Sequence, residues 1–210
     1  MSSIDMNLLE AQTKKVYDAN AVAFDQQRSK DLFEQKWLDR FRSHLQHGDA
    51  ILDCGCGSGE PITGYFIRNK YAVTGVDFSP EMLEIARHRF PQNDWLLQDM
   101  RQLKIARTFE GVISWNAFFH LNHQDQCAVF SKLNDHLKPG GVLMLTVGHM
   151  KGEAVGQVNG QSVYHSSLSL DEYKSILIKY RFQLLDFIPQ DPDCRQHTIP
   201  LAKKVSSLGP

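Results

Sequence analysis

The chain has little of what marks a secreted or membrane-bound protein. Its four cysteines, Cys54, Cys56, Cys127 and Cys194, are too few and too scattered for a disulfide framework in 210 residues. The first ten residues lack a basic region followed by an apolar core, and no window approaches the roughly 18 apolar residues that cross a bilayer. We therefore expect free thiols, no membrane association and a cytoplasmic location.

An excess of charge of either sign is also missing. The sequence has 23 lysine and arginine residues against 24 aspartate and glutamate residues, which gives a formal net charge of -1. A chain so balanced has no global basic field of the kind that draws proteins onto phosphate backbones. We therefore expect no nucleic-acid partner.

Ligand sets for metal ions are incomplete. Cys54 and Cys56 form a C-x-C pair without a second pair of cysteines, and His120 and His123 lack a third ligand. Because zinc sites use three or four protein ligands, packing roles are favoured for these side chains and we expect no metal. A phosphate-binding P-loop and a carboxylate cluster are also absent, which argues against kinase-like and nuclease-like chemistry.

The chain does have an alternation of strand and helix signals. With 210 positions and 42% hydrophobic residues, it suits one compact α/β domain whose mostly parallel sheet is covered by helices on both faces. An amphipathic helical segment over residues 10–46 comes first. Strands are then expected at residues 50–53, 72–77, 95–98, 111–115, 141–147, 182–188 and 197–204.

Capping signals mark several helix boundaries. Pro61 suits the first turn of a helix, and Ser79 followed by Pro80 supplies an N-cap and a proline at the first helical position. Residues 138–141, Lys-Pro-Gly-Gly, are expected to end a helix over residues 125–137 and to turn into the next strand.

The most informative segment is the loop after the first expected strand. Asp53 is followed by Gly55, Gly57 and Gly59, and glycines at such a turn bring bare backbone against a ligand, where any Cβ would clash. The second expected strand ends at Asp77, 20 residues beyond Gly57, where a carboxylate can hold two ribose hydroxyls. This spacing alone allows either an NAD-type site or an S-adenosylmethionine site.

The order of residues within the loop separates the two. Dinucleotide loops run G-x-G-x-x-G, whereas this loop runs G-x-G-x-G after Asp53, which would repel a pyrophosphate and attract an ammonium or sulfonium group. Three further motifs follow in order, at residues 75–83, 98–100 and 137–141. On these four motifs the chain resembles the class I S-adenosylmethionine-dependent methyltransferases, of the small bacterial type that acts on small molecules.

The resemblance implies a Rossmann-like sheet of seven strands, six parallel and the last inserted antiparallel beside the fifth, with helices on both faces. Residues 1–210 would form a single methyltransferase domain, with residues 1–46 as an N-terminal helical lid and residues 205–210 as a tail. Pro200 fits the last strand poorly, because proline removes a ladder donor. Whether the protein is a monomer or a homodimer stays open.

The resemblance also assigns cofactor contacts. Asp53 is expected to orient the methionyl amino group, and the segment Gly55-Cys56-Gly57 to approach the methionyl and ribose portions. Asp77 is expected to accept hydrogen bonds from both ribose hydroxyls, with Phe78 beside the adenine. Two adenine contacts come from the end of the third expected strand, Asp99 and the backbone of Met100.

Four more cofactor contacts lie in the N-terminal helices and at the end of the fourth expected strand: Tyr17, Arg28, Trp115 and Asn116. Tyr17 would lie over the cofactor, and Arg28 would reach its carboxylate. An ordinary surface helix is the alternative explanation for Arg28, since exposed arginines are frequent.

The acceptor-site candidates are Phe118, Phe119, Tyr164 and His165, with His120 as the candidate general base. Histidine titrates near neutrality, and His120 lies just beyond the fourth expected strand. Residues 148–153 and 162–166 are glycine-rich and polar, which predicts a mobile substrate loop. Core packing of the aromatic residues, a structural histidine and an edge hairpin are the respective alternatives.

The expected activity is transfer of a methyl group from S-adenosylmethionine to a small molecule by in-line displacement, with S-adenosylhomocysteine as product. The acceptor and its reacting atom, nitrogen, oxygen, sulfur or carbon, cannot be read from the sequence. Three other interpretations stay open: an NAD-dependent oxidoreductase on a similar fold, a non-catalytic S-adenosylmethionine-binding module, and a protein or peptide methyltransferase.

Overall fold

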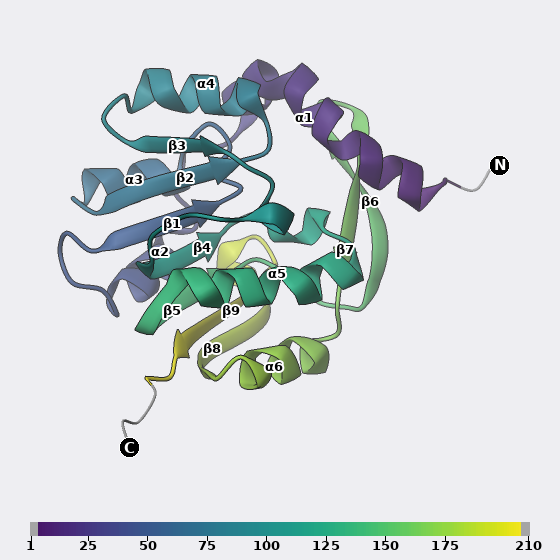
Figure 1. The fold of residues 1–210 in the computed structure, drawn as a ribbon. Coiled ribbons are helices and arrows are strands. Elements are labelled where there is room, and N and C mark those ends of the chain that lie inside the picture. The colour runs from purple at the N-terminus through teal and green to yellow at the C-terminus, as the bar shows by residue number, and fades with distance from the viewer. Residues whose placement is uncertain (1–3, 207–210) are drawn as a thin grey trace.

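The computed structural model describes residues 4–206, and its main sheet has seven strands in the order β3-β2-β1-β4-β5-β9-β8 (Figure 1). The strands are β1 (Ala50–Cys54), β2 (Ala72–Asp77), β3 (Asp94–Leu97), β4 (Phe109–Ser114), β5 (Leu137–Leu145), β8 (Phe182–Asp191) and β9 (His197–Lys204). Strands β1 to β5 pair in parallel, and β9 is antiparallel to both of its neighbours, β5 and β8. The predicted sheet, with one antiparallel strand beside the fifth, is confirmed.

Helices cover both faces of this sheet, as predicted. Within residues 4–206 they are α1 (Met6–Gln27), α2 (Gln35–Arg42), α3 (Ile62–Arg68), α4 (Pro80–Arg89), α5 (His123–His136) and α6 (Leu170–Lys179), with single turns η1 (Met100–Gln102), η2 (Phe118–His120) and η3 (Pro192–Cys194). Successive strand residues point to opposite faces, so Ile51 packs with α2 and α3 while Leu52 packs with α5 and α6. No helix in this part of the chain is long and apolar enough to cross a membrane.

The capping predictions hold at α4 and shift at two other places. Ser79 is the N-cap of α4, its hydroxyl accepts a hydrogen bond from the backbone of Met82, and Pro80 begins the helix. Pro61 stands one residue before α3 rather than within its first turn. The turn expected at residues 138–141 lies inside β5, where the pairing with β4 shifts register and Gly140 has φ +80°.

Pro200 lies within β9 without interrupting it. It is opposite Phe187 of β8, while the ladder to β5 ends at Leu201 and resumes only as an isolated bridge at Thr198. The missing N–H of proline therefore falls where the ladder to β5 is already open. Of the expected tail at residues 205–210, Val205 and Ser206 have no regular structure, and the remaining residues lie outside the described range.

The segment expected to be a mobile loop contains an antiparallel hairpin, which was the alternative interpretation of these residues. Strands β6 (Gly152–Val158) and β7 (Gln161–Ser167) pair along their whole length. Asn159 and Gly160 form the turn with φ values of +47° and +75°. Asn-Gly is the dipeptide that tight two-residue hairpin turns favour, so the signal was present in the sequence.

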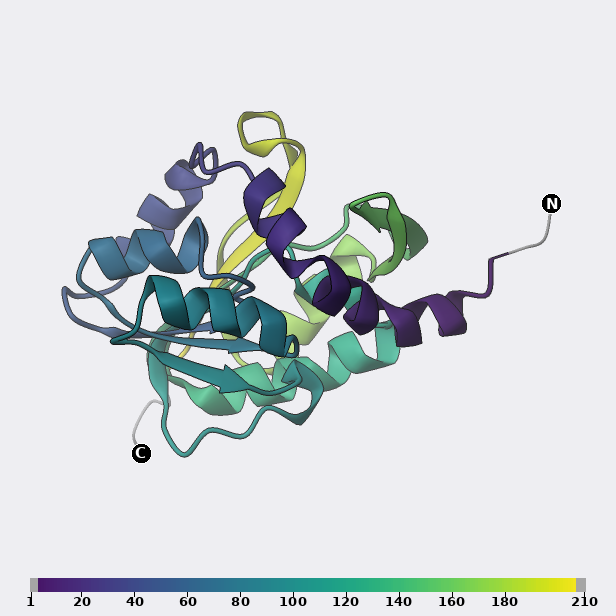
Figure 2. The same cartoon turned by 90° about the horizontal axis from the view of Figure 1, so that it is seen from above.

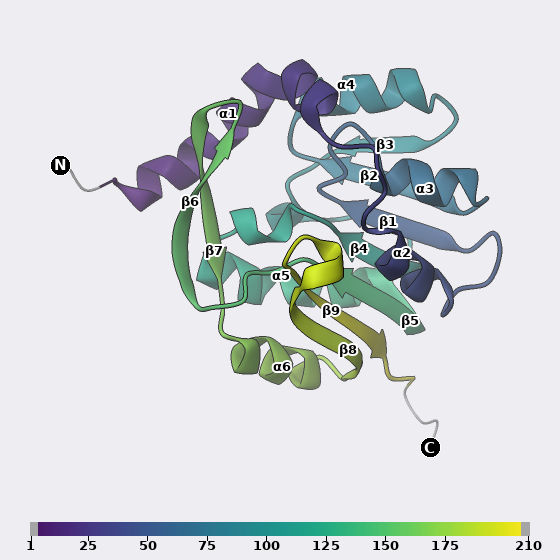
Figure 3. The same ribbon diagram turned by 180° about the vertical axis from the view of Figure 1, so that it is seen from behind.

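The hairpin and α1 lie together at the edge of the sheet where β1 to β4 end (Figures 1 and 3). Val16 of α1 packs against Val158 and Val163 of the hairpin, and α1 also contacts α4, as the view from above shows (Figure 2). The lid predicted for residues 1–46 is therefore α1 alone within the described residues. Helix α2 instead buries Trp37 against the sheet.

Candidate active site

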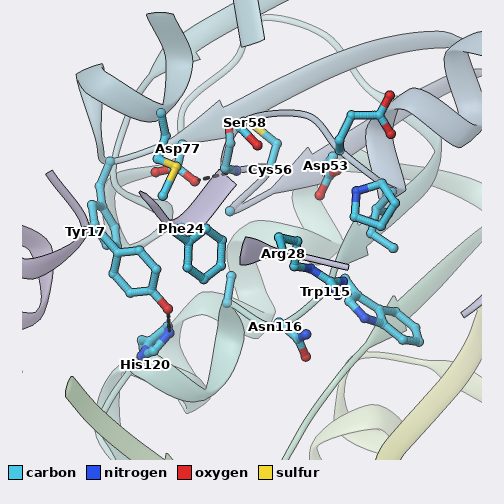
Figure 4. A pocket seen from close by; sticks show the side chains of 18 of the residues that line it. Tyr17, Phe24, Arg28, Asp53, Cys56, Ser58, Asp77, Trp115, Asn116 and His120 are labelled. Carbon is cyan, nitrogen blue, oxygen red and sulfur yellow. Dashed lines mark hydrogen bonds between the residues drawn. The ribbon is translucent and has the colours of Figure 1, made fainter. Parts of the chain in front are cut away.

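A pocket lies at the carboxyl ends of β1, β2 and β4, beneath α1 (Figure 4). Crevices at this edge of open parallel sheets are where such folds bind ligands. The empty volume between its walls, open solvent included, is about 710 Å³. Its walls are Tyr17, Phe24, Arg28, Asp53, Gly55, Cys56, Gly57, Ser58, Glu60, Pro61, Ile62, Asp77, Phe78, Met82, Met100, Trp115, Asn116, Ala117 and His120.

Two glycines of the loop after β1 serve different purposes. Gly55 has φ +80°, and a Cβ there would overlap the Cβ of Ala117. Gly57 has φ +54°, but a Cβ there would meet no described protein atom within 4 Å. Gly55 is therefore required by packing, whereas the bare backbone of Gly57 faces space that a ligand can fill.

Asp77 is held at the end of β2 by the backbone. It accepts hydrogen bonds from the N–H of Gly57 at 2.8 Å and from the N–H of Ser79 at 2.9 Å. Burial nevertheless raises its pKa to about 6, because desolvation outweighs these hydrogen bonds.

Asp53 faces the same pocket from the end of β1. Its side chain is buried, and Thr63 donates a hydrogen bond to it at 2.6 Å. Desolvation raises its pKa to about 7, with a further contribution from the charge of Asp77. No cationic side chain of residues 4–206 offsets either buried carboxylate. A ligand with an ammonium or sulfonium group and vicinal hydroxyls would supply the positive charge and the hydrogen-bond donors that these two carboxylates lack.

The opposite wall offers an unpaired donor. The indole Nε1 of Trp115 is buried and has no hydrogen-bond partner among the described residues. Arg28 lies in the same wall, where its guanidinium pairs with the buried Glu34 at 2.5 Å. A carboxylate in this part of the pocket would satisfy the Trp115 donor and lie near the guanidinium.

His120 is enclosed by the protein. Its Nδ1 lies 2.8 Å from the carbonyl oxygen of Tyr164, and its Nε2 lies 2.9 Å from the hydroxyl of Tyr17 (Figure 4). A carbonyl only accepts, so Nδ1 carries the proton and Nε2 accepts from Tyr17. Burial lowers the pKa of His120 to about 3, which keeps the ring neutral.

Three of the expected site residues do not line this pocket. Asp99 lines an adjoining pocket that shares Phe78, Met100, Ala117 and His120 with it, and both of its carboxylate oxygens bind the side chain of Arg101, so its adenine contact stays a prediction. The assignments of the other two were wrong. Phe118 is fully buried and packs against Phe130 in the core. Tyr164 is also buried, and its hydroxyl donates to Glu153.

Phe119 and His165 line a second cavity, with an empty volume of about 1030 Å³. It is enclosed by residues 147–154, the hairpin and the turn before β9. His197 also lines it, and its Nε2 lies 2.8 Å from Oδ1 of Asn116 in the first pocket. This contact joins the two cavities.

Several wall residues were missed from the sequence: Phe24, Ser58, Glu60, Pro61, Ile62, Met82, Ala117 and, in the second cavity, His197. Ser58 and Glu60 continue the glycine loop, so its extent was the available signal. A second missed feature anchors α1. Asp25 accepts hydrogen bonds from Arg89 of α4 at 2.8 and 3.0 Å and from Ser58 at 2.5 Å.

No group of three or more His, Cys, Asp or Glu side chains in residues 4–206 is placed to hold a metal ion.

Residues 51–141 match a family model described as a methyltransferase domain. The chain is 30% identical over 153 residues to a malonyl-[acyl-carrier protein] O-methyltransferase of Serratia marcescens, covering 66% of this chain and 55% of the relative. It is 29% identical over 109 residues to a dTDP-3-amino-3,4,6-trideoxy-alpha-D-glucopyranose N,N-dimethyltransferase of Streptomyces venezuelae, covering 51% and 46%. The chain thus spans about half the length of these curated relatives.

Among solved structures, the fold is similar to that of a 1,6-didemethyltoxoflavin-N1-methyltransferase of Burkholderia thailandensis, solved with 1,6-didemethyltoxoflavin and S-adenosylhomocysteine. The TM-score is 0.74 at 17% sequence identity, and the alignment covers 98% of this chain and 93% of that one. At this identity the likeness shows the fold.

Proposed function

We propose that this chain is a class I S-adenosylmethionine-dependent methyltransferase that transfers a methyl group from S-adenosylmethionine to a small-molecule acceptor. The observation that carries the proposal is the pair of buried carboxylates, Asp53 and Asp77, which face one pocket and have no ion-pair partner among the described residues. A cationic ligand bearing ribose hydroxyls would compensate both.

The pocket residues divide the cofactor between them. Asp53 would hold the ammonium group, and Asp77 the ribose hydroxyls beside the open space at Gly57. Trp115 Nε1 and Arg28 would lie toward the carboxylate. Cys56, Phe78 and Met100 would pack against the remaining apolar surface, as wall residues of the same pocket.

When bound, S-adenosylmethionine supplies a methyl group on a positively charged sulfur, which a nucleophile displaces in line. The protein then needs to align the acceptor and exclude water. Tyr17 and Phe24 of α1 close the pocket. Their ring centroids lie 5.5 Å apart in an edge-to-face contact. The cofactor is therefore covered by the lid helix while the acceptor enters from another side.

His120 is the candidate general base, but the burial that lowers its pKa to about 3 makes it a weak base, contrary to the near-neutral titration expected from the sequence. Because its Nε2 lone pair is occupied by the Tyr17 hydroxyl, a proton from the acceptor would reach it through Tyr17 or after that hydrogen bond opens. The acceptor would lie in the second cavity, with Phe119 and His165 in its wall. A small molecule suits this cavity because the hairpin and the turn before β9 enclose it.

The formal net charge of -1 favours a small-molecule partner over nucleic acid. We take the protein to act in the cytoplasm, as a monomer or homodimer.

Incubation with S-adenosylmethionine labelled in its methyl group and a size-fractionated cell extract tests the proposed function. We expect label in the fraction of small molecules. Label in the protein fraction alone would support a protein methyltransferase, and no transfer to any fraction would support a cofactor-binding module.

A further inference from the structure

Asn116 has an unusual backbone that two other strands hold in place. Its φ is +54°, in the left-handed region, which asparagine adopts more readily than other residues besides glycine. Its N–H donates to Oγ1 of Thr146, just after β5, at 2.7 Å. Its side-chain Oδ1 lies 2.8 Å from Nε2 of His197, the first residue of β9. Such strain persists where surrounding structure fixes it, and it gathers at functional sites.

The antiparallel direction of β9 is what brings His197 to this edge. A parallel last strand would place its carboxyl end at this edge. Because β9 is antiparallel, its first residue lies beside the carboxyl ends of β4 and β5. The imidazole is also fixed in orientation. It stacks on Trp115 with centroids 5.7 Å apart and 23° between planes, and Phe33 lies 5.8 Å away.

Hydrogen-bond chemistry limits how His197 can meet Asn116. Nδ1 of His197 lies 2.7 Å from the carbonyl oxygen of Cys194, so this nitrogen carries a proton. If the ring is neutral, Nε2 has only a lone pair and needs a donor, which is the –NH2 end of the Asn116 amide. If the ring is protonated, Nε2–H donates to the carbonyl oxygen, the arrangement with Oδ1 toward Nε2. A half-turn of the amide exchanges the two.

The other end of the amide is available to a ligand. Asn116 lines the cofactor pocket, and its Nδ2 forms no hydrogen bond with residues 4–206. Figure 4 shows this side chain between His120 and Trp115. The end of the Asn116 amide that binds His197 therefore determines whether the oxygen or the nitrogen at the other end faces the pocket.

Several charged or titratable groups face His197 from the elements packed around it. They are Arg28 after α1, Glu34 before α2, Cys194 and Arg195 before β9, and His149, Lys151, Glu153 and His165 across the second cavity. Burial lowers the pKa of His197, while the Cys194 carbonyl and the charge of Glu34 act in the opposite direction. The neutral ring is therefore the form at neutral pH.

We infer that His197 is a positioning residue that determines which end of the Asn116 amide faces the pocket: the carbonyl oxygen when His197 is neutral, and the amide nitrogen when it is protonated. At neutral pH the cofactor pocket then presents an acceptor oxygen at Asn116, whose partner His197 lines the second cavity. It selects a methyl acceptor that carries an N–H or O–H group and disfavours a carboxylate or thiolate. The acceptor class rests on the proposed function, whereas the coupling of His197 to Asn116 does not.

Nitrogen-15 NMR of the ligand-free protein tests the coupling directly, between pH 5 and 8. We expect the Nδ1–H tautomer of His197 at pH 8, and an Asn116 side-chain amide signal that titrates with the midpoint of His197. His197→Phe keeps a ring against Trp115 and Phe33 but removes both nitrogens, so the Asn116 signal should lose its pH dependence. His88→Gln, at an exposed position of α4, is the control and should leave it unchanged. An Nε2–H tautomer, or an Asn116 amide that ignores His197 in the wild type, would overturn the inference.

Methyl transfer to the labelled small-molecule fraction supplies the second readout. His197→Phe should lower the rate about tenfold or more, as expected for a misplaced contact, and leave S-adenosylhomocysteine affinity within about threefold. His197→Gln, whose amide donates or accepts at any pH, should restore part of the rate without its pH dependence. Equal losses of rate and cofactor affinity would contradict a positioning role. If the wild type binds S-adenosylhomocysteine but transfers no methyl group, the proposed function fails, and the NMR titration still decides the role of His197.

Discussion

The hydroxyl of Tyr17 donates a hydrogen bond to Nε2 of His120 at 2.9 Å, which joins the lid helix α1 to the turn after β4. The same histidine donates from Nδ1 to the backbone of Tyr164 in β7. One buried, neutral imidazole thus connects the lid, the hairpin and the end of a central strand. These contacts hold α1 over the pocket, and Asp25 holds its C-terminal end to Arg89 of α4.

Tyr17→Phe should remove the contact while keeping the ring between Phe24 and Phe78. Because it leaves a mostly buried Nε2 without a donor, the free energy of unfolding should fall by about 1–2 kcal/mol at pH 7, measured by urea denaturation. Tyr71→Phe is the control, since the Tyr71 hydroxyl makes no hydrogen bond to residues 4–206. A Tyr17→Phe protein as stable as the control would show that the contact contributes nothing.

Asp53→Asn should make the ligand-free protein more stable at pH 8 and less able to bind cofactor. The pKa of Asp53 is about 7 when folded and near 4 when unfolded, so the native state binds the extra proton between these values. Stability from this group is therefore full below about pH 4 and is lost as the pH rises toward 7. The variant should exceed the wild type by about 1–3 kcal/mol at pH 8 and by little at pH 4. Equal stability of the two proteins at pH 8 would contradict an uncompensated Asp53 charge.

Gly57→Ala should damage cofactor binding more than folding. The added Cβ meets no described protein atom, so the loss of stability should be the cost of a left-handed alanine, about 1–2 kcal/mol. The affinity for S-adenosylhomocysteine should fall at least about tenfold, or about 1.4 kcal/mol, because the Cβ enters the pocket. Gly48→Ala carries similar strain, with φ +90° and open space, but lies outside the pocket. If both variants bind equally well, the space beside Gly57 is not a cofactor site.

Arg89→Gln should speed the release of cofactor. Arg89 grips both carboxylate oxygens of Asp25 and also donates to the Ser58 carbonyl, which fixes the end of α1 to α4 and the glycine loop. Loss of this half-buried bidentate pair should raise the dissociation rate of S-adenosylhomocysteine about threefold to tenfold in stopped-flow experiments. Arg87→Gln, whose partner Glu84 is exposed, should not change the rate. An unchanged dissociation rate in Arg89→Gln would mean that the Arg89–Asp25 contact does not control the release of the cofactor.

The sheet and the glycine loop were predictable because their signals are local. Each parallel strand is a short apolar run, and Gly55, Gly57 and Asp77 mark where strands end. The hairpin was equally local, but its signal, the Asn159-Gly160 turn, lay between the two segments that were considered. The side chain of Arg101, two residues after Asp99, binds both oxygens of that carboxylate, which no motif records.

The roles of aromatic and histidine side chains were not predictable in the same way. Phe118 and Phe119 are neighbours in sequence, but η2 turns one into the core and the other toward the second cavity. His197 meets Asn116 across 81 residues, and only the antiparallel direction of β9 brings them together. Such contacts depend on strand order and register, which no short motif records.

The most direct test of the cofactor assignment is calorimetric titration with S-adenosylhomocysteine and, separately, with NAD, on the wild type, Asp77→Ala and Asp94→Ala. Asp94 is the control, because it lies exposed on the neighbouring strand β3. We expect the wild type and Asp94→Ala to bind S-adenosylhomocysteine alike, Asp77→Ala to bind it at least about tenfold more weakly, and none to bind NAD. Binding of NAD alone, or of neither ligand by folded wild-type protein, would contradict the assignment.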